Sequence, residues 1–199
     1  MAAGNGRKLP TAGENPGGRA RAPGSLYLVQ ALVNTFSGHT LEDLLATPAA
    51  ASGWLAAAGL LPAGSPLSGG ERQALIGTRE AIRGVLSAHT QRAADASAAA
   101  RLTEALLPCR LTVAADPAGA VHLTCADEHP YARVVGAIAV AIAEAAMAGT
   151  WHRLKACPGD RCGWAFYDRS SGGRSRWCSM QVCGARTKMR AYRSRQGGR

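Results

Sequence analysis

The sequence lacks any apolar run of about eighteen residues, the shortest that would serve as a membrane-spanning helix. The longest candidate, residues 136–149, is shorter and contains Glu144. The first residues also lack the apolar core of a secretory signal. We therefore expect a cytoplasmic protein without a membrane segment, whose cysteines stay reduced.

Motifs of catalysis are missing as well. The sequence has no glycine-rich phosphate loop, no nucleophile elbow and no paired histidines, and its five His are scattered. We therefore predict that the protein is not an enzyme. The one polar cluster that could form an N-terminal ligand site is Asn34 and Thr35 with nearby His39. A small-molecule reaction at that cluster is kept as a third hypothesis.

Acidic residues are scarce at one end of the chain. Residues 151–199 contain 12 Lys and Arg but only 2 Asp and Glu, whereas residues 1–150 contain 11 of each kind and are neutral. The whole net charge of +10 therefore lies in the last quarter. A neutral body with a basic end is typical of a protein that binds a polyanion.

Bulky apolar side chains are nearly absent from residues 1–24, which contain six Gly and three Pro, so we expect a disordered tail there. Helical periodicity then predicts helices over residues 25–35, 47–59, 68–89, 95–107 and 130–149. The last of these helices is apolar on most sides, which is typical of the centre of a core.

Local signals support these boundaries and add one strand pair. Thr47 before Pro48 is a typical helix start, and Ser68 with Glu71 has the spacing of a capping box. Polar and apolar residues alternate over 110–113 and 121–124, on either side of a turn signal, which predicts a β-hairpin. The predicted fold class is mainly α with a β-hairpin, with a helical domain over residues 25–150.

Four of the six cysteines form two Cys-x4-Cys pairs: Cys157 with Cys162 and Cys178 with Cys183. Four thiolates in two pairs satisfy a tetrahedral zinc ion, and the short spacing lets each pair grip the ion from one turn. Two disulfides are the alternative, which a reducing cytoplasm disfavours. Four protein ligands leave no open position, so we predict one structural Zn²⁺ on which folding of residues 151–199 depends.

Aromatic residues gather between the two pairs. The segments 164–168 and 174–177 flank Ser171-Gly172-Gly173, which predicts a second hairpin whose aromatic side chains could cover the metal. After Ser179, a typical N-cap, we expect a helix to about residue 195. Helical spacing gives it an inward apolar stripe and a separate basic face. The stripe is Val182, Ala185, Met189 and Tyr192, and the basic face is Arg186, Arg190 and Arg193.

Such a helix, anchored by zinc, can lie along a nucleic acid, where cations gain from the release of condensed counterions. A solvated charged face is the alternative. Lys188 and Arg195 widen the basic face, and Arg174 and Arg176 of the predicted hairpin are secondary candidates for phosphate contacts.

The other two cysteines, Cys109 and Cys125, lie at nearly matching positions of the first predicted hairpin. They could face each other across the strands and form a reversible disulfide. Two unrelated buried thiols are the alternative, because a free cysteine behaves as a small apolar residue.

The segment CPGDRCGWAFYDRSSGGRSRWCSMQVCGARTKMRAYRSR, which begins at Cys157, resembles the finger of the CGNR zinc-finger family, and LVQALVNT and DLLATPAAASGWL upstream resemble its N-terminal ABATE domain. Members are bacterial proteins regarded as stress-induced transcription regulators. The resemblance implies a helical N-terminal domain with a short hairpin, zinc ligation by the four paired cysteines, and DNA binding by a domain over residues 151–199. In the naming motif Cys-Gly-Asn-Arg, Ala185 replaces the Asn, so the amide that could bond an adenine edge is absent.

We therefore predict a zinc-dependent transcription regulator whose basic helix binds DNA. Because one finger binds weakly, specific recognition would need a homodimer, for which the apolar N-terminal helices could supply the interface. The alternative is an RNA- or ribosome-associated protein without sequence-specific DNA readout. That function would expose aromatic rings for base stacking, whereas the DNA hypothesis buries most of them around zinc. The rings concerned are Trp164, Phe166, Tyr167 and Trp177.

Overall fold

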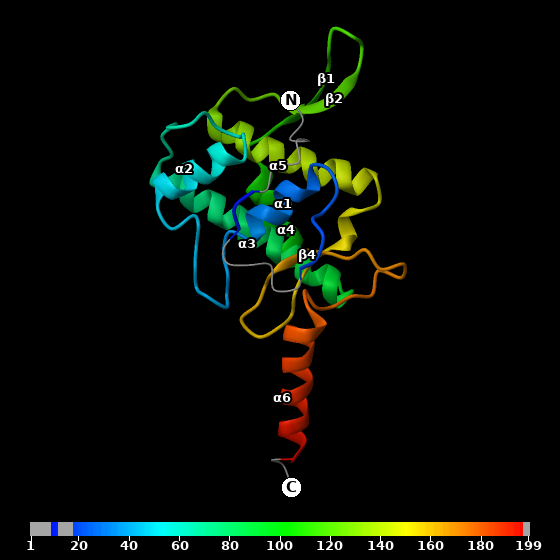
Figure 1. Ribbon diagram of the computed structural model, residues 1–199. Coiled ribbons are helices and arrows are strands. Elements are labelled where there is room, and N and C mark those ends of the chain that lie inside the picture. Colours follow the sequence, from blue (N-terminus) through cyan, green and yellow to red (C-terminus); the bar gives the residue numbers. More distant parts are fainter. Residues whose placement is uncertain (1–8, 12–17, 197–199) are drawn as a thin grey trace.

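The computed structural model describes residues 9–11 and 18–196, apart from the side chains of residues 191, 195 and 196. A helical N-terminal region carries one projecting hairpin, and a C-terminal region carries a second hairpin, the four paired cysteines and a protruding last helix (Figure 1). The predicted fold class is confirmed. In order, the elements are α1 (Leu26–Val33), α2 (Pro48–Ala57), α3 (Gly69–Gln91), α4 (Ala96–Leu106), β1 (Leu111–Ala115), β2 (Val121–Cys125), α5 (Pro130–Met147), the 3₁₀ turn η1 (Trp151–Arg153), β3 (Leu154–Ala156), β4 (Ala165–Tyr167), the π-helical turn η2 (Met180–Gly184) and α6 (Ala185–Gln196).

The helices begin where local chemistry favours a start. The Thr47 side chain accepts a hydrogen bond from the backbone of Ala50 at 3.1 Å, directly before Pro48. Ser68 accepts from the backbone of Glu71, whose carboxylate accepts from the backbone of Ser68, so the predicted capping box is confirmed. Each cap satisfies a backbone donor that the helix itself leaves unpaired.

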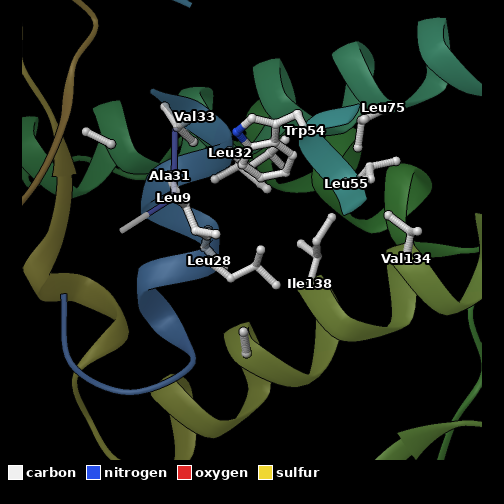
Figure 2. Close-up of a cluster of buried hydrophobic side chains, with 14 of the residues drawn as sticks. Leu9, Leu28, Ala31, Leu32, Val33, Trp54, Leu55, Leu75, Val134 and Ile138 are labelled. Atoms are coloured by element: carbon white, nitrogen blue, oxygen red, sulfur yellow. The ribbon is translucent and has the colours of Figure 1, made fainter. Parts of the chain in front are cut away.

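Helix α5 lies against α1 and contributes to the main core, as its composition predicted. By length and composition alone α5 could cross a membrane, but half of it is buried inside the chain, as in the core helix of a globular protein. Figure 2 shows Val134 and Ile138 of α5 pointing toward Leu28 of α1 and Leu55 of α2. All four side chains are buried, so this region holds its helices by ordinary apolar packing.

The β1–β2 hairpin confirms the predicted strand pair. The strands are antiparallel, with Val113 opposite Leu123, and the Asp116 side chain holds the turn by accepting from the backbones of Ala118 and Ala120. At the other end of the hairpin, Cys109 and Cys125 lie together against Gly136 of α5. A Cβ at Gly136 would lie 2.4 Å from that of Cys125, so only glycine allows α5 to approach the strands so closely.

The second hairpin differs from the prediction. β4 pairs with β3, with Lys155 opposite Phe166, and residues 174–177 are not a strand. The predicted pairing was wrong because three-residue strands give too short an alternation to identify a partner. β3 and β4 also bury Leu154, Ala165 and Tyr167 in the core of the N-terminal region. The boundary near residue 150 between two domains stays a prediction.

Parts of the N-terminal segment pack on this body, where the sequence predicted a disordered tail. Leu9 and Ala22 are buried in the main core, and the Trp54 ring nitrogen donates to the Pro10 carbonyl at 2.9 Å. The physical reason is that a few apolar side chains and one backbone carbonyl are enough to hold short stretches of the segment against the surface of the folded core. Residues 1–8 and 12–17 lie outside the described part of the chain.

Candidate metal centre and basic helix

The four paired cysteines converge on one buried point. The Sγ atoms of Cys157, Cys162, Cys178 and Cys183 all lie within 4.8 Å of one another, and each residue is buried. Cys178 Sγ lies 3.6 Å from both Cys162 Sγ and Cys183 Sγ. Four sulfurs at the usual zinc distance of about 2.3 Å would be about 3.8 Å apart, so the cluster has the dimensions of a tetrahedral site.

The first pair is held by the connection between β3 and β4. The Cys157 backbone donates to Trp164 at 2.9 Å, and the Cys162 backbone donates to Gly159 at 2.9 Å, which closes a tight turn around both thiols. A Cβ at Gly159 would lie 3.1 Å from Cys183 Sγ. Glycine therefore lets the backbone of this turn come close to the sulfur of the other pair.

The second pair lies at the start of the last helix. Ser179 is the predicted N-cap, and its hydroxyl accepts from the backbone of Val182 at 3.2 Å. Cys183 then lies in the π-helical turn η2, which continues directly into α6. A metal ion bound by Cys178 and Cys183 therefore fixes the root of α6.

Four thiolates packed together in a buried cluster repel one another and are unfavourable without a cation. Hydrogen bonds with Cys157 and then Cys162 raise the pKa of Cys178, and burial raises it further. Burial is also the main cause that raises the pKa of Cys183. A divalent cation reverses this penalty because it stabilises the thiolate form of each ligand. The donor set therefore fits one structural Zn²⁺, which leaves no coordination position for substrate.

Aromatic rings and the N-terminal region surround this centre. Trp164 and Phe166 are buried in one cluster with the four cysteines, and Trp177 packs against it half-buried. From the other side, His39 Nε2 lies 3.9 Å from Cys183 Sγ. A Cβ at Gly38 would lie 2.0 Å from the Arg161 carbonyl oxygen, so the loop before α2 touches the turn of the first pair.

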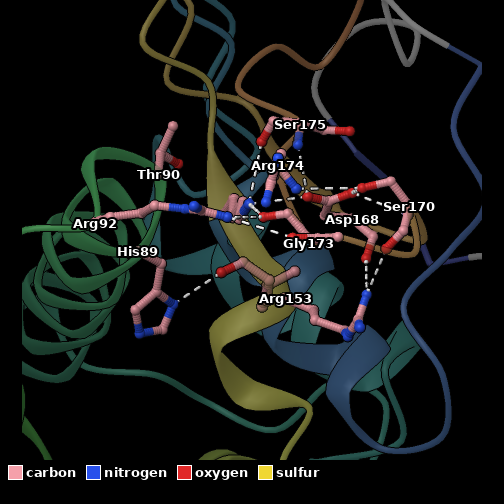
Figure 3. A network of polar contacts seen from close by, with 12 residues as sticks. His89, Thr90, Arg92, Arg153, Asp168, Ser170, Gly173, Arg174 and Ser175 are labelled. Atoms are coloured by element: carbon pink, nitrogen blue, oxygen red, sulfur yellow. Dashed lines mark hydrogen bonds and ion pairs between the residues drawn. The ribbon is translucent and has the colours of Figure 1, made fainter.

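Asp168 organises the segment that leads from β4 to the second pair. Its carboxylate is fully buried and accepts from the Lys155 ammonium at 2.9 Å, the Ser175 backbone at 2.8 Å and the Ser170 hydroxyl at 2.7 Å (Figure 3). Burial alone would raise its pKa, but the bonds from Lys155 and Ser170 outweigh burial and lower it. Asp168 therefore stays ionised and fixes the path of residues 168–175.

The predicted basic face is exposed on α6, which extends away from the body (Figure 1). Arg186, Lys188, Arg190 and Arg193 are all exposed, and Arg190 forms a surface ion pair with Asp160 at 3.0 Å. Arg174 and Arg176 are exposed in the segment before Cys178 and are not part of α6. The side chain of Arg195 lies outside the described residues.

The sequence predicted that the apolar stripe of α6 faces inward, but in the structure most of it is exposed. Met189 and Tyr192 are each 53% exposed, and Ala185 is exposed as well. Only Val182, at the root, packs against the cysteine cluster. The prediction was wrong because helical spacing gathers apolar side chains on one face without supplying a partner for that face.

The predicted N-terminal ligand residues are both buried and bonded within the protein. The Asn34 side chain accepts from the Ala165 backbone at 2.7 Å and donates to the Ala165 carbonyl at 3.0 Å, as a neighbouring strand would. The Thr35 hydroxyl donates to Leu32 and accepts from Arg79, which also binds Asp43 through two nitrogens. These contacts support a role in joining the helices to the C-terminal hairpin, and ligand binding at Asn34 and Thr35 stays a prediction.

Sequence reasoning gave no role at the metal centre to three residues that shape it: His39, Asp168 and Arg19. Arg19 donates to the carbonyls of Trp177 and Cys178 at 2.8 and 2.9 Å, directly beside the second pair. No local pattern marks Arg19 or His39. The sequence does contain one indication for Asp168, because Asp160 and Asp168 are the only acidic residues in the basic last quarter.

Comparison with known families matches both regions. Residues 153–196 match the family described as "CGNR zinc finger", and residues 27–149, more than half of the chain, match the ABATE family, described as "Putative stress-induced transcription regulator". A comparison with curated proteins gives no match. The chain therefore belongs to the ABATE family and ends in a CGNR zinc finger.

Proposed function

We propose that this protein is a DNA-binding transcription regulator of the cytoplasm, without enzymatic activity, in which a structural zinc ion presents α6 to duplex DNA. The observation that carries the proposal is the surface of α6. Arg186, Arg190 and Arg193 lie along one face of a helix that the body does not cover, and the root of that helix contains two of the four cysteines. A row of guanidinium groups on a protruding helix suits the phosphates beside a groove.

The burial of aromatic rings favours DNA over single-stranded RNA. Trp164, Phe166 and Tyr167 are buried, and Trp177 is half-buried against the cysteine cluster. Base stacking on single strands needs exposed ring faces. These four rings therefore serve packing, and the alternative of an RNA-binding or ribosome-associated protein loses the stacking surface on which it depended.

The regulator we propose acts as a homodimer. The N-terminal helices were the predicted interface, but their apolar faces are used within the core. The β1–β2 hairpin instead exposes apolar side chains on one face, including Val113 at 64% and Val121 at 68%. An exposed apolar face on a two-stranded sheet is suited to self-association. Light scattering of wild type and Val113→Lys tests this part: a dimer that the substitution dissociates supports it, and a monomeric wild type rules it out.

Duplex affinity measured against salt concentration tests the proposed DNA contact. Each phosphate contact adds about 0.9 to the slope of log affinity against log salt. Changing Arg186 and Arg190 together to Ala should lower duplex affinity and reduce this slope by about two. Fluorescence anisotropy of a labelled duplex provides both quantities.

A matched control changes Arg101 and Arg133 to Ala. Both residues are exposed arginines of the neutral N-terminal region, so the control removes the same charge at a distance from α6. Equal losses in the two double variants would show a general charge effect and contradict the assignment to α6. Selection of bound sequences from random duplexes then tests regulation, because a regulator enriches a defined motif and a general binder does not.

A further inference from the structure

An open cavity of about 690 Å³ lies at the junction of the two regions, within the size range of small-molecule sites. One wall is apolar and made of small side chains from the end of α3 and the start of α4, such as Val85, Ala88 and Ala99. The opposite wall comes from η1, β3 and the 171–173 turn of the zinc region. Neither region forms the cavity alone.

Two arginines line this cavity. Arg92 donates to the carbonyls of Gly172 and Gly173, and Arg153 donates to the carbonyls of Asp168 and Ser170 (Figure 3). Within residues 9–11 and 18–196, no carboxylate forms an ion pair with either guanidinium. The arginines are therefore held in place by neutral oxygens, and their charges remain uncompensated.

The cavity also contains Lys155, the ionised carboxylate of Asp95 and the ring of His89. Lys155 is paired with the buried carboxylate of Asp168. The Asp95 carboxylate caps α4 by accepting from the backbone of Ala98 at 2.9 Å. Burial is the main cause that lowers the pKa of His89, whose ring also bonds the Leu154 carbonyl, so that ring is uncharged at neutral pH. The two arginines thus outnumber Asp95, the one carboxylate of the cavity lining, and the cavity keeps a net positive charge.

The backbone at Arg92 supports a role for its side chain. Arg92 ends α3 in the left-handed conformation, with φ of 56°, at a position where glycine is usual. A non-glycine residue pays about 1 kcal/mol or more for that conformation. With this backbone the Arg92 guanidinium extends across the junction and donates to the 172–173 carbonyls.

We propose that this cavity binds a small organic anion whose apolar body lies on the α3 and α4 wall and whose negative group is held by Arg92 and Arg153. The anion would bridge the two regions, because its two halves contact walls that belong to different regions. Binding requires no DNA, so the zinc-loaded full chain is tested alone and the outcome is independent of the proposed regulator function.

Two matched dyes test the ligand class. The anion 8-anilinonaphthalene-1-sulfonate and neutral N-phenyl-1-naphthylamine share one ring system and differ by the sulfonate. We expect saturable fluorescence with the anion and at least about tenfold weaker binding of the neutral dye, as one well-placed charge contact provides. Equal affinities for the two dyes would overturn the proposal, since they would show an apolar site alone.

Substitutions and histidine resonances locate the site. Arg92→Gln should weaken binding of the anion about tenfold, and Ala99→Trp should abolish it by filling the apolar wall. Arg133→Gln, at an exposed arginine of α5 that does not line the cavity, should change nothing. In proton NMR the anion should shift His89 and His152, which line the cavity, and leave His122 and His129 unmoved. Anion binding unaffected by both cavity substitutions, or shifts confined to His122 and His129, would refute the site.

A separate observation concerns Cys109 and Cys125. A Cβ at Gly136 would lie 3.0 Å from the Sγ of each cysteine, so the two sulfurs are at most 6.0 Å apart, the sum of those distances. Burial and then the hydrogen bond with Cys125 raise the pKa of Cys109 to about 12. Both residues are only half-buried, within reach of small oxidants.

We infer that peroxide links this pair in a disulfide. The Cys125 sulfur attacks one peroxide oxygen, the O–O bond breaks and a sulfenic acid forms with release of water. The Cys109 sulfur then attacks Cys125 Sγ and displaces a second water, so two thiols and one peroxide give one disulfide and two waters. Cys125 is placed for the first step because its thiol faces the Asp127 carboxylate, with Sγ 4.0 Å from Oδ2.

Mass spectrometry after peroxide treatment and alkylation tests this inference on the zinc-loaded chain. We expect a peptide cross-linked between Cys109 and Cys125 while zinc stays bound, and trapping of a Cys125 sulfenic acid by dimedone in Cys109→Ser. Full alkylation of both cysteines after the zinc ligands have oxidised would overturn it.

Discussion

The two family regions of this chain are stabilised in different ways. Residues 27–149 bury an aliphatic core of helices, whereas residues 153–196 enclose four cysteines with Trp164 and Phe166 and leave α6 exposed. The β3–β4 hairpin joins the two, because its inner face belongs to the aliphatic core while its connection carries the first cysteine pair. The difference implies that the metal serves mainly to order the segment after the hairpin, including the root of α6.

Removing a zinc ligand is the strongest way to separate the two regions. Cys178→Ser should release the ion and with it a binding free energy on the order of 10 kcal/mol. We expect near-ultraviolet circular dichroism of Trp164 and Trp177 to collapse while most far-ultraviolet helical signal remains, because the N-terminal core does not contain the metal. Cys125→Ser is the control and should keep one zinc per chain. Loss of the helical signal as well would show that the regions fold only together.

Asn34→Ala should weaken the junction itself. The substitution leaves the Ala165 backbone buried without its partners at 2.7 and 3.0 Å, which costs about 1 to 3 kcal/mol in the free energy of unfolding. Urea denaturation checks the size of the loss. A change below a few tenths of a kcal/mol would mean that Asn34 does not couple the regions.

Gly136→Ala probes the packing of the N-terminal region alone. The new Cβ would lie 2.4 Å from that of Cys125, so we expect a loss of about 1 to 3 kcal/mol despite the better helix propensity of alanine. Gly77→Ala on α3 meets nothing within 4 Å and should instead stabilise by up to about 1 kcal/mol. Thermal unfolding of both variants measures the two changes in stability. A change of the same sign in both variants would contradict the close approach of α5 to the strands.

Ser68→Ala should have the smallest effect. It removes one half of the capping box at the start of α3, worth about 1 kcal/mol. Zinc content and duplex affinity should not change, since the cap lies on the N-terminal region alone. A loss of zinc in this variant would argue for coupling that the structure does not contain.

The features that the sequence predicts well in this chain are local. Thr47, Ser68 and Ser179 were identified as caps because a cap involves residues two or three apart. The four-cysteine cluster was predicted because the spacing of Cys157 to Cys162 and of Cys178 to Cys183 is that of turns that can bind one ion.

The features that the sequence could not predict depend on distant partners. The β3–β4 pairing spans a loop between strands of three residues each, too short for a periodic pattern. Asn34 meets Ala165 from 131 residues away, with no local sign of that contact. The prediction of an inward face on α6 was wrong for the same reason. The apolar spacing does not show whether another element covers Met189.

Zinc titration in the presence of a labelled duplex tests the central claim most directly. Metal-free, reduced protein should bind the duplex weakly, because nothing fixes the root of α6, and a free helix of this length is marginal in water. Anisotropy should rise as zinc is added and reach its plateau at one equivalent per chain. Full duplex affinity without metal, or no rise at one equivalent, would contradict the account.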